Sequence, residues 1–380
     1  MADQLRAPVL PVGDEKIAWA NPWHRLVAGR GFQAWAARVP LLRRMVRAEG
    51  AALFDVISGF VQAQALMAMV ELRVFEHLAA GPQTADALAP RCGLTTPKMQ
   101  ILLQAGAALG LLRRKRGARF GLSQRGAALL GVPGLQAMIR HHAVLYRDLT
   151  DPVAFLRGQT DPDLARFWPY VFGADGARDP VVAETYSTLM SDTQQMVAAD
   201  TLAVISLRGV RQLLDIGGGT GAFVAAVGAQ YQGLQLGLFD LPAVAAAAQA
   251  RMSAAGLADR VKIHSGSFRD DPLPQGSDAI SLVRVLYDHA DSTVAALLAR
   301  VYDALPVGGR LIVSEPMSGG DRPDPATDVY FAFYTLAMQT GRTRSAAEIS
   351  EMLKVAGFQQ IVCHPSRRPF VTTAITATRV

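Results

Sequence analysis

The stretch Leu213-Leu214-Asp215-Ile216-Gly217-Gly218-Gly219-Thr220-Gly221 decides the fold of this 380-residue chain. Its apolar residues predict a short buried strand, and the alanine-rich run 222–229 predicts a helix directly after the glycines. Glycines let the backbone turn sharply and let a ligand approach it closely. The start of the helix presents unpaired N–H groups to a polar or anionic part of that ligand. The stretch therefore predicts a nucleotide-type site between a strand and a helix.

Asp240 is the second part of this predicted site. It lies nineteen residues after Gly221 and ends the apolar run 234–239, which reads as the next strand. A carboxylate at the end of the second strand is placed to accept hydrogen bonds from both hydroxyls of a ribose. The ligand is therefore expected to contain a nucleoside.

The glycine pattern leaves the kind of cofactor open. Gly217, Gly219 and Ala222 also satisfy the dinucleotide pattern G-x-G-x-x-A, and a turn that binds no nucleotide is a further alternative. Asp215 favours S-adenosylmethionine, because a carboxylate close to the first glycine repels a pyrophosphate and attracts an ammonium group. No separate catalytic domain follows the motif, which also suits S-adenosylmethionine better than a nicotinamide cofactor.

The rest of the second half alternates between strands and helices. Further strands are predicted at 261–264, 279–286 and 310–314, and an antiparallel pair at 359–364 and 370–378. We therefore expect an α/β fold with a doubly wound, mostly parallel sheet and a terminal antiparallel hairpin. Ligands of such sheets bind outside the carboxyl ends of the strands, where four further candidates fall: Ser267, Phe268, Tyr287 and Glu315.

The first half is predicted to be helical, with a winged-helix pattern. A long apolar helix over 50–80, broken near Gly59, precedes a helix that starts at Thr84, a helix over 96–109 and a hairpin over 111–122 with a basic tip. Winged helices often bind DNA. The run 97–103 is too apolar for a helix that lies in a DNA groove, so we favour a dimerisation domain and no nucleic-acid partner.

An arginine-rich segment precedes this domain. Residues 21–48 contain six arginines and no acid, interleaved with apolar residues that include Trp23, Phe32 and Trp35. Such a basic amphipathic segment is typical of peripheral contact with an anionic membrane. The alternative is packing on a partner subunit with the arginines in solvent.

Length and composition limit the class of protein. We expect a tail over 1–20, a dimerisation domain over 21–156, a linker and interdomain helix over 157–206 that includes the aromatic residues 167–172, and a catalytic domain over 207–380. Two cysteines give no disulfide framework and favour the cytoplasm. The uncharged stretch between Asp55 and Glu71 has fifteen residues, fewer than the roughly 20 that span a bilayer. We expect no metal.

Taken as a set, these motifs resemble the cation-independent small-molecule O-methyltransferases. The resemblance rests on the winged helix followed by D-x-G-G-G-x-G and by Phe239-Asp240-Leu241-Pro242. Further matches are Met190-Ser191-Asp192, the run 304–309 and Arg344 before Glu348. It implies a homodimer that uses S-adenosylmethionine without a metal ion.

The resemblance also implies roles for individual residues. The cofactor would contact Gly217, Gly219, Gly221 and Asp240, with Arg284 at a basic contact position. Ser267 replaces the family's usual acid near the adenine, and Phe268 keeps its apolar neighbour. Tyr287 stands at the position of the family's usual catalytic histidine. Glu315 matches the first of the two glutamates that support this histidine, and Thr343 replaces the second.

Within this family, three runs (145–149, 167–170 and 267–272) are most similar to carotenoid methylases of phototrophic bacteria. That similarity implies an acyclic hydroxycarotenoid with a tertiary hydroxyl as substrate. The alternatives are a methylase of a bacteriochlorin or a polyketide phenol and, from another class, a winged-helix transcription factor that responds to a ligand.

An aliphatic alcohol also changes the expected chemistry. Tyr287 is predicted to position the hydroxyl, since a phenol with a pKa near 10 is a poor base at neutral pH. If the chain is extended there, His289 lies on the same face and is the candidate base. Glu315 is expected to orient either group.

Overall fold

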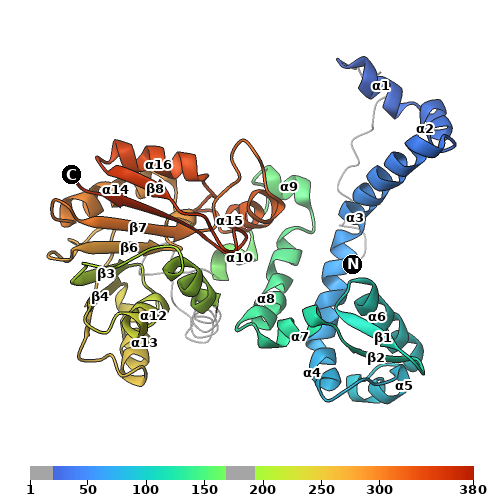
Figure 1. Cartoon of the computed structure of the whole chain (residues 1–380), viewed down its shortest axis with the longest axis horizontal. Helices are drawn as coiled ribbons and strands as arrows, with labels where there is room; N and C mark the ends of the chain where they lie inside the picture. Colours follow the sequence, from blue (N-terminus) through green and yellow to red (C-terminus); the bar gives the residue numbers. More distant parts are fainter. Residues whose placement is uncertain (1–19, 168–192) are drawn as a thin grey trace. The chain divides into compact units, whose positions relative to one another are not determined.

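The computed structural model describes residues 20–167 and 193–380. The chain, coloured along its sequence in Figure 1, divides into two compact units, residues 1–66 and 67–380. Most of the predicted tail, the aromatic residues 168–172 and Met190-Ser191-Asp192 lie outside the described residues.

The first unit contains α1 (Pro22–Ala28), α2 (Arg30–Ala36) and most of α3 (Pro40–Glu71). Phe32 holds α1 and α2 together, because its ring lies 5.7 Å from that of Trp23 and 5.8 Å from that of Trp35. The six arginines of the segment 21–48 are all exposed.

Helix α3 differs from two predictions made from the sequence. It runs through Gly59 without a break and ends at Glu71, because one glycine costs a helix only about 1 kcal/mol relative to alanine. The chain turns instead at Arg73, whose φ is 53°. By length and composition the part Leu42–Glu71 could also cross a membrane, which the count of fifteen uncharged residues had excluded. One such helix is weak evidence of a span, since long apolar helices of soluble proteins pass the same test.

The second unit begins with the winged-helix pattern that the sequence predicts. Helices α4 (Val74–Ala79), α5 (Ala85–Leu88) and α6 (Thr96–Ala108), with the 3-10 turn Pro90–Cys92, precede the antiparallel pair β1 (Leu112–Lys115) and β2 (Arg119–Leu122). Thr84 caps α5 by accepting the N–H of Ala87 at 3.3 Å. Helices α7 (Gln124–Gly131), α8 (Leu135–Asp148), α9 (Pro152–Leu156) and α10 (Asp163–Phe167) follow.

The rest of this unit is built around a seven-stranded sheet, whose strands lie in the order β5-β4-β3-β6-β7-β9-β8. Its strands are β3 (Gln212–Ile216), β4 (Gln235–Asp240), β5 (Val261–Ser265), β6 (Ala279–Val283), β7 (Arg310–Glu315), β8 (Gln359–Cys363) and β9 (Thr373–Thr378). β3 to β7 are parallel, and β9 pairs antiparallel with β7 and β8. The predicted doubly wound sheet with a terminal hairpin is confirmed.

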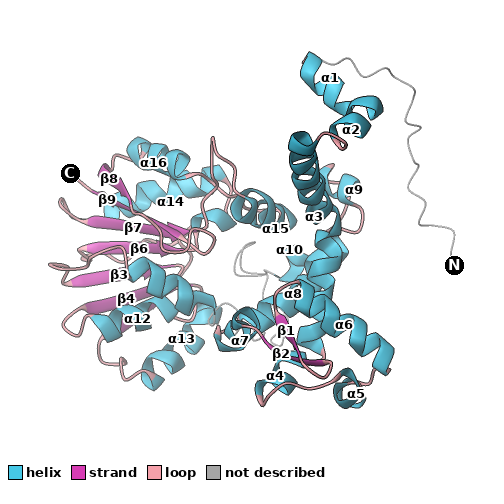
Figure 2. Cartoon of the chain, turned by 45° about the vertical axis from the view of Figure 1, so that its right-hand side comes forward, coloured by secondary structure: helices cyan, strands magenta, loops and turns pink. Residues whose placement is uncertain are grey.

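Helices cover both faces of this sheet (Figure 2). Leu214 and Ile216 of β3 pack in one core with α14 (Asp291–Ala304) and α16 (Ala346–Val355). Leu213 packs in the other core with α12 (Ala222–Gln230), α13 (Pro242–Ala254) and the helical residues 193–202. Because both faces are buried, the strands read as apolar runs rather than as alternating patterns.

The order of the strands in the sheet indicates where a ligand would bind. The chain winds outward from β3 to β5 and then returns to β6 on the other side of β3, so β3 and β6 form the switch point where ligands of such sheets bind. β6 is shorter than predicted, because Arg284 directly after it has a φ of 58° and ends the strand. The 3-10 turn η4 (Leu286–Asp288) follows.

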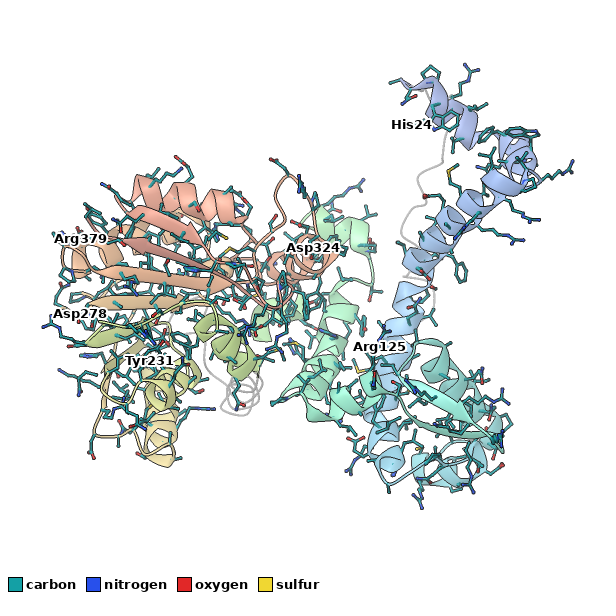
Figure 3. The ribbon with its side chains drawn as sticks, viewed as in Figure 1. His24, Arg125, Tyr231, Asp278, Asp324 and Arg379 are labelled. Atoms are coloured by element: carbon teal, nitrogen blue, oxygen red, sulfur yellow. The ribbon has the colours of Figure 1, made fainter. Side chains whose placement is uncertain are left out.

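Side chains seal the opposite, amino-terminal end of the sheet. Asp278, labelled in Figure 3, accepts the backbone N–H groups of Arg211 at 2.8 Å and Gln212 at 3.3 Å. The guanidinium of Arg379 lies 4.8 Å from the ring centroid of Tyr302 in α14. These contacts hold the sheet at the end away from the predicted ligand.

Candidate active site

The glycine turn after β3 leaves no room for side chains on its inner side. Gly217 and Gly221 have φ values of 67° and 82°, which only glycine adopts readily. A Cβ on Gly217 would lie 2.8 Å from Val285, and one on Gly221 would lie 2.7 Å from Met252. The turn brings the amide N–H of Gly219 to within 2.6 Å of Asp240 Oδ2.

Asp240 is held at the end of β4 by two backbone donors. Its Oδ1 accepts the N–H of Leu241 at 2.7 Å, and its Oδ2 accepts that of Gly219. Burial raises the pKa of Asp240, although both donors oppose this rise. Each oxygen keeps a second lone pair, so the carboxylate can still accept two ribose hydroxyls.

Asp215 lies beneath the glycine turn and is almost fully buried. Its Oδ1 accepts a hydrogen bond from Ser281 at 2.6 Å, but Oδ2 has no partner among the described residues. Burial raises the pKa of Asp215 to about 7. A buried carboxylate oxygen without a donor is stabilised by a nearby cation, so this residue suits an ammonium group.

Ser267 and Phe268 lie in a tightly held loop after β5. Asp271 accepts the Ser267 N–H at 2.7 Å, and Arg300 donates to the carbonyls of Phe268 and Arg269 at 2.6 and 2.7 Å. The ring of Phe268 meets that of His289 edge to face, with centroids 5.2 Å apart. This loop therefore brings an apolar ring to the carboxyl ends of the strands.

Arg284 organises the polar side chains after β6. It donates to Thr193 Oγ1 at 3.2 Å and to Tyr287 Oη at 3.0 Å. Burial raises the pKa of Tyr287 above its usual range and that of Asp288 to about 7, and the charge of Arg284 opposes both shifts. Asp288 Oδ1 is buried without a hydrogen-bond partner among the described residues. A single cation thus faces a phenol and a carboxyl group at the switch point.

The turn that carries Tyr287 is held from two sides. Glu315, at the end of β7, accepts the N–H groups of Leu286 and Tyr287 at 3.0 and 3.2 Å. Arg344, which is completely buried, donates to the carbonyls of Leu286 and His289 at 2.9 and 2.7 Å. Glu315 therefore orients the backbone of the turn rather than a side chain. Burial raises the pKa of Glu315 to about 8.

His289 does not lie as the sequence analysis assumed. Leu286–Asp288 is a 3-10 turn, so the premise of an extended chain is wrong. The Nδ1 atom of His289 lies 3.1 Å from Nη2 of Arg269. Because arginine is only a donor, Nδ1 must accept, and the proton of the neutral ring stays on Nε2. Burial lowers the pKa of His289 to about 4, so the neutral ring dominates near pH 7.

Part of this site could not be predicted from the sequence. Asp288 and Arg344 lie at its centre, yet Asp288 resembles an ordinary loop acid in the sequence, and Arg344 was noted only as a family match. No group of three or more side chains that could hold a metal ion occurs in the described part of the chain.

Family models match most of the chain. A model of the O-methyltransferase domain matches residues 146–359, and a model of the O-methyltransferase dimerisation domain matches residues 54–131. The chain belongs to the O-methyltransferase family. The second match supports a homodimer and identifies the winged-helix region as the dimerisation domain of such an O-methyltransferase.

Two similar O-methyltransferases are named demethylspheroidene O-methyltransferase. The protein from Cereibacter sphaeroides is 61% identical over 355 residues, which cover 93% of this chain and 94% of that protein. The protein from Rhodobacter capsulatus is 54% identical over 359 residues, covering 94% and 90%. Human N-acetylserotonin methyltransferase, solved in complex with S-adenosylmethionine, superposes with a TM-score of 0.74 at 25% identity, covering 87% of this chain and 97% of that one.

These matches confirm that this O-methyltransferase uses S-adenosylmethionine, and the site fits that cofactor. The free lone pairs of Asp240 suit the ribose of S-adenosylmethionine. The Asp215 oxygen that has no partner among the described residues suits its ammonium group. The open side of the glycine turn leaves room for the cofactor next to the backbone.

Proposed function

We propose that this enzyme methylates the tertiary hydroxyl of an acyclic hydroxycarotenoid of the hydroxyneurosporene or demethylspheroidene type. The observation that carries the proposal is the 61% identity over nearly the whole length of a demethylspheroidene O-methyltransferase. Two relatives named for naphthoates are 33% and 29% identical, which makes a phenol the weaker candidate.

Aromatic side chains beside the site suit an apolar substrate. The π-helix η5 (Pro325–Phe331) and α15 (Ala332–Ala337) carry Tyr330, Phe331, Phe333 and Tyr334. Phe331 meets Tyr287 edge to face at 6.5 Å, and Phe333 stacks on Phe155 at 6.2 Å. These rings would hold a polyene by apolar contact and keep water from the hydroxyl.

The geometry of the site supports the following roles. S-adenosylmethionine supplies the methyl group as a strong electrophile. Its binding is assigned to Asp215, Gly217, Gly219, Gly221, Asp240, Ser267, Phe268 and Arg284. Tyr287, fixed by Arg284, positions the substrate hydroxyl, and Glu315 holds the turn that carries Tyr287. The geometry disfavours His289 as the base, because its Nδ1 lone pair already accepts from Arg269.

The substrate is tested by product analysis. With methyl-labelled S-adenosylmethionine, we expect the enzyme to convert a purified acyclic hydroxycarotenoid into a methyl ether that is one methyl group heavier. A bacteriochlorin and a hydroxynaphthoate are assayed in parallel at equal concentration. Faster labelling of either one than of the carotenoid would refute the proposed substrate class.

We further propose that the enzyme is cytoplasmic and contacts the membrane at its periphery through residues 21–48. A carotenoid dissolves in the bilayer, so the enzyme must meet it there. The six exposed arginines and the exposed indoles of Trp23 and Trp35, each 54% exposed, support this assignment. Anionic lipids attract each such cation by about 1 kcal/mol.

We expect the enzyme to float with vesicles of anionic lipid, and flotation to weaken as salt rises because ions screen the arginines. Replacing Arg25, Arg30, Arg43 and Arg47 with glutamine should reduce flotation strongly. The matched control replaces four exposed arginines elsewhere, Arg113, Arg114, Arg116 and Arg119, in the same way. Equal flotation of both variants would exclude the segment as the membrane contact.

A further inference from the structure

Two adjacent histidines of α8 each contact a tyrosine that lies far away in the sequence. His141 Nε2 lies 2.8 Å from Tyr334 Oη, and His142 Nε2 lies 2.7 Å from Tyr330 Oη. His141 and Tyr334 are buried, whereas His142 and Tyr330 are only partly buried. The two pairs therefore share their chemistry and differ in their access to a ligand.

The possible hydrogen-bond partners of the Tyr330 hydroxyl indicate which of them receives its proton. Besides His142, its hydroxyl contacts only the thioether of Met138, at 3.9 Å, among the described residues. A thioether is a weak acceptor, and an unprotonated imidazole nitrogen at 2.7 Å is a far better one. Burial lowers the pKa of His142, so the ring is neutral near pH 7. Of the two hydrogen bonds that the Tyr330 hydroxyl can donate, the one to Nε2 of His142 is therefore the stronger, and it leaves oxygen lone pairs for another donor.

A single aromatic ring, that of Phe331, links Tyr330 to Tyr287, the predicted catalytic position. The ring of Tyr330 contacts Phe331 edge to face at 5.0 Å, and Phe331 contacts Tyr287 in the same way. The positive charge of Arg284, which donates to Tyr287, also acts on Tyr330 and opposes the rise that burial causes in its pKa.

Tyr330 lies in the π-helix η5. Asp324, labelled in Figure 3, caps this helix by accepting the N–H of Ala326 at 2.9 Å and, less closely, that of Thr327 at 3.4 Å. Irregular helices of this kind occur frequently at functional sites.

We propose that Tyr330 is a catalytic residue that accepts the hydroxyl proton of the substrate while its own proton passes to Nε2 of His142. This inference rests on the proposed methylation of an aliphatic hydroxyl. As the new C–O bond forms, the substrate O–H bond breaks and its proton goes to Tyr330 Oη. The methyl group arrives as a cation equivalent and its donor leaves as a neutral thioether, so the positive charge ends on the His142 imidazolium. The imidazolium then returns its proton to solvent.

This relay gives the chain a proton acceptor that lies outside the turn after β6. Tyr287 replaces the histidine of related enzymes, and the lone pair of His289 is used by Arg269. His142, which lies in a different part of the chain, would act as the final proton acceptor. It is a positioning residue that acts through Tyr330.

The test compares His142→Gln with His141→Gln, an adjacent change that removes the same kind of bond from the buried pair. We expect His142→Gln and Tyr330→Phe each to lower kcat for a hydroxycarotenoid by about 100-fold. His141→Gln should lower it by no more than a few-fold. Calorimetric binding of S-adenosylmethionine and the thermal midpoint show whether each variant is folded. Equal kcat losses in the two histidine variants would overturn the relay.

The pH profile separates a relay from a merely structural bond. The titratable groups around His142 are His141 and Tyr146 on its own helix and Tyr330 on η5. Wild-type kcat should fall as pH drops through the lowered His142 pKa, because an imidazolium cannot accept a proton. This fall should disappear in His142→Gln. An unchanged acid limb in that variant would overturn the proposal.

Nitrogen-15 spectra of the histidine side chains test the pair without turnover. We expect His142 to carry its proton on Nδ1 at pH 7.5 and its Nε2 signal to shift in Tyr330→Phe. A proton on Nε2 would overturn the relay. If the wild-type enzyme methylates no hydroxycarotenoid, the proposed function fails, and this spectrum still decides the direction of the hydrogen bond.

Discussion

Replacing Arg344 with methionine should lower the thermal midpoint by several degrees and almost abolish turnover. Arg344 is fully buried and donates to two carbonyl oxygens of the turn that carries Tyr287. The His289 carbonyl would lose this donor, and an unsatisfied buried carbonyl costs about 1–3 kcal/mol. The Leu286 carbonyl would keep only the N–H of His289. With the loss of a charged hydrogen bond there, we expect a destabilisation of about 2–4 kcal/mol.

Arg342→Met is the matched control for this experiment. Arg342 and Arg344 both form an ion pair with Asp291, but the Arg342 side chain is 46% exposed, and an exposed ion pair contributes about 0–1 kcal/mol. Thermal melts of both variants, with and without S-adenosylmethionine, provide the comparison. Equal midpoints would show that the buried guanidinium does not hold the turn.

The sequence predicted the sheet because its signals are local. Buried strands such as 213–216 read as short apolar runs, and the glycines and Asp240 lie at fixed distances from their ends. The break in the first long helix was misplaced at Gly59 for an equally local reason. A glycine weakens a helix only slightly, and nothing in the composition around Arg73 marks its left-handed conformation.

Side-chain partners across long sequence separations could not be predicted. The two histidines of α8 meet tyrosines 188 and 193 positions away, and no spacing rule connects them. Adjacent residues face different sides of a helix, so the positions of His141 and His142 in the sequence indicate no shared ligand or partner. They do diverge, yet each finds its own hydroxyl partner. Likewise, no spacing rule predicts the contact of Arg269 with His289, twenty positions away, which occupies the Nδ1 lone pair of that histidine.

Asp240→Ala should weaken S-adenosylmethionine binding by about tenfold or more, and by about 100-fold or more if both ribose hydrogen bonds are lost in full. Hydrogen bonds to a charged acceptor contribute about 1.5–3 kcal/mol each, and each 1.4 kcal/mol is a factor of about ten in Kd. The substitution also removes the acceptor for the Gly219 amide, which loosens the glycine turn. Asp259→Ala, which removes an exposed acid of the same domain, is the control for net charge.

A cofactor analogue without the two ribose hydroxyls separates direct recognition from loosening of the turn. If Asp240 accepts from the ribose, the analogue should bind the wild type more weakly than S-adenosylmethionine does. In Asp240→Ala the two ligands should bind with nearly equal affinity, because the lost bonds are the same ones. Isothermal calorimetry of both ligands with both proteins completes this cycle. If removing the hydroxyls weakened binding equally in the wild type and in Asp240→Ala, Asp240 would act only by holding Gly219, and the ribose assignment would be wrong.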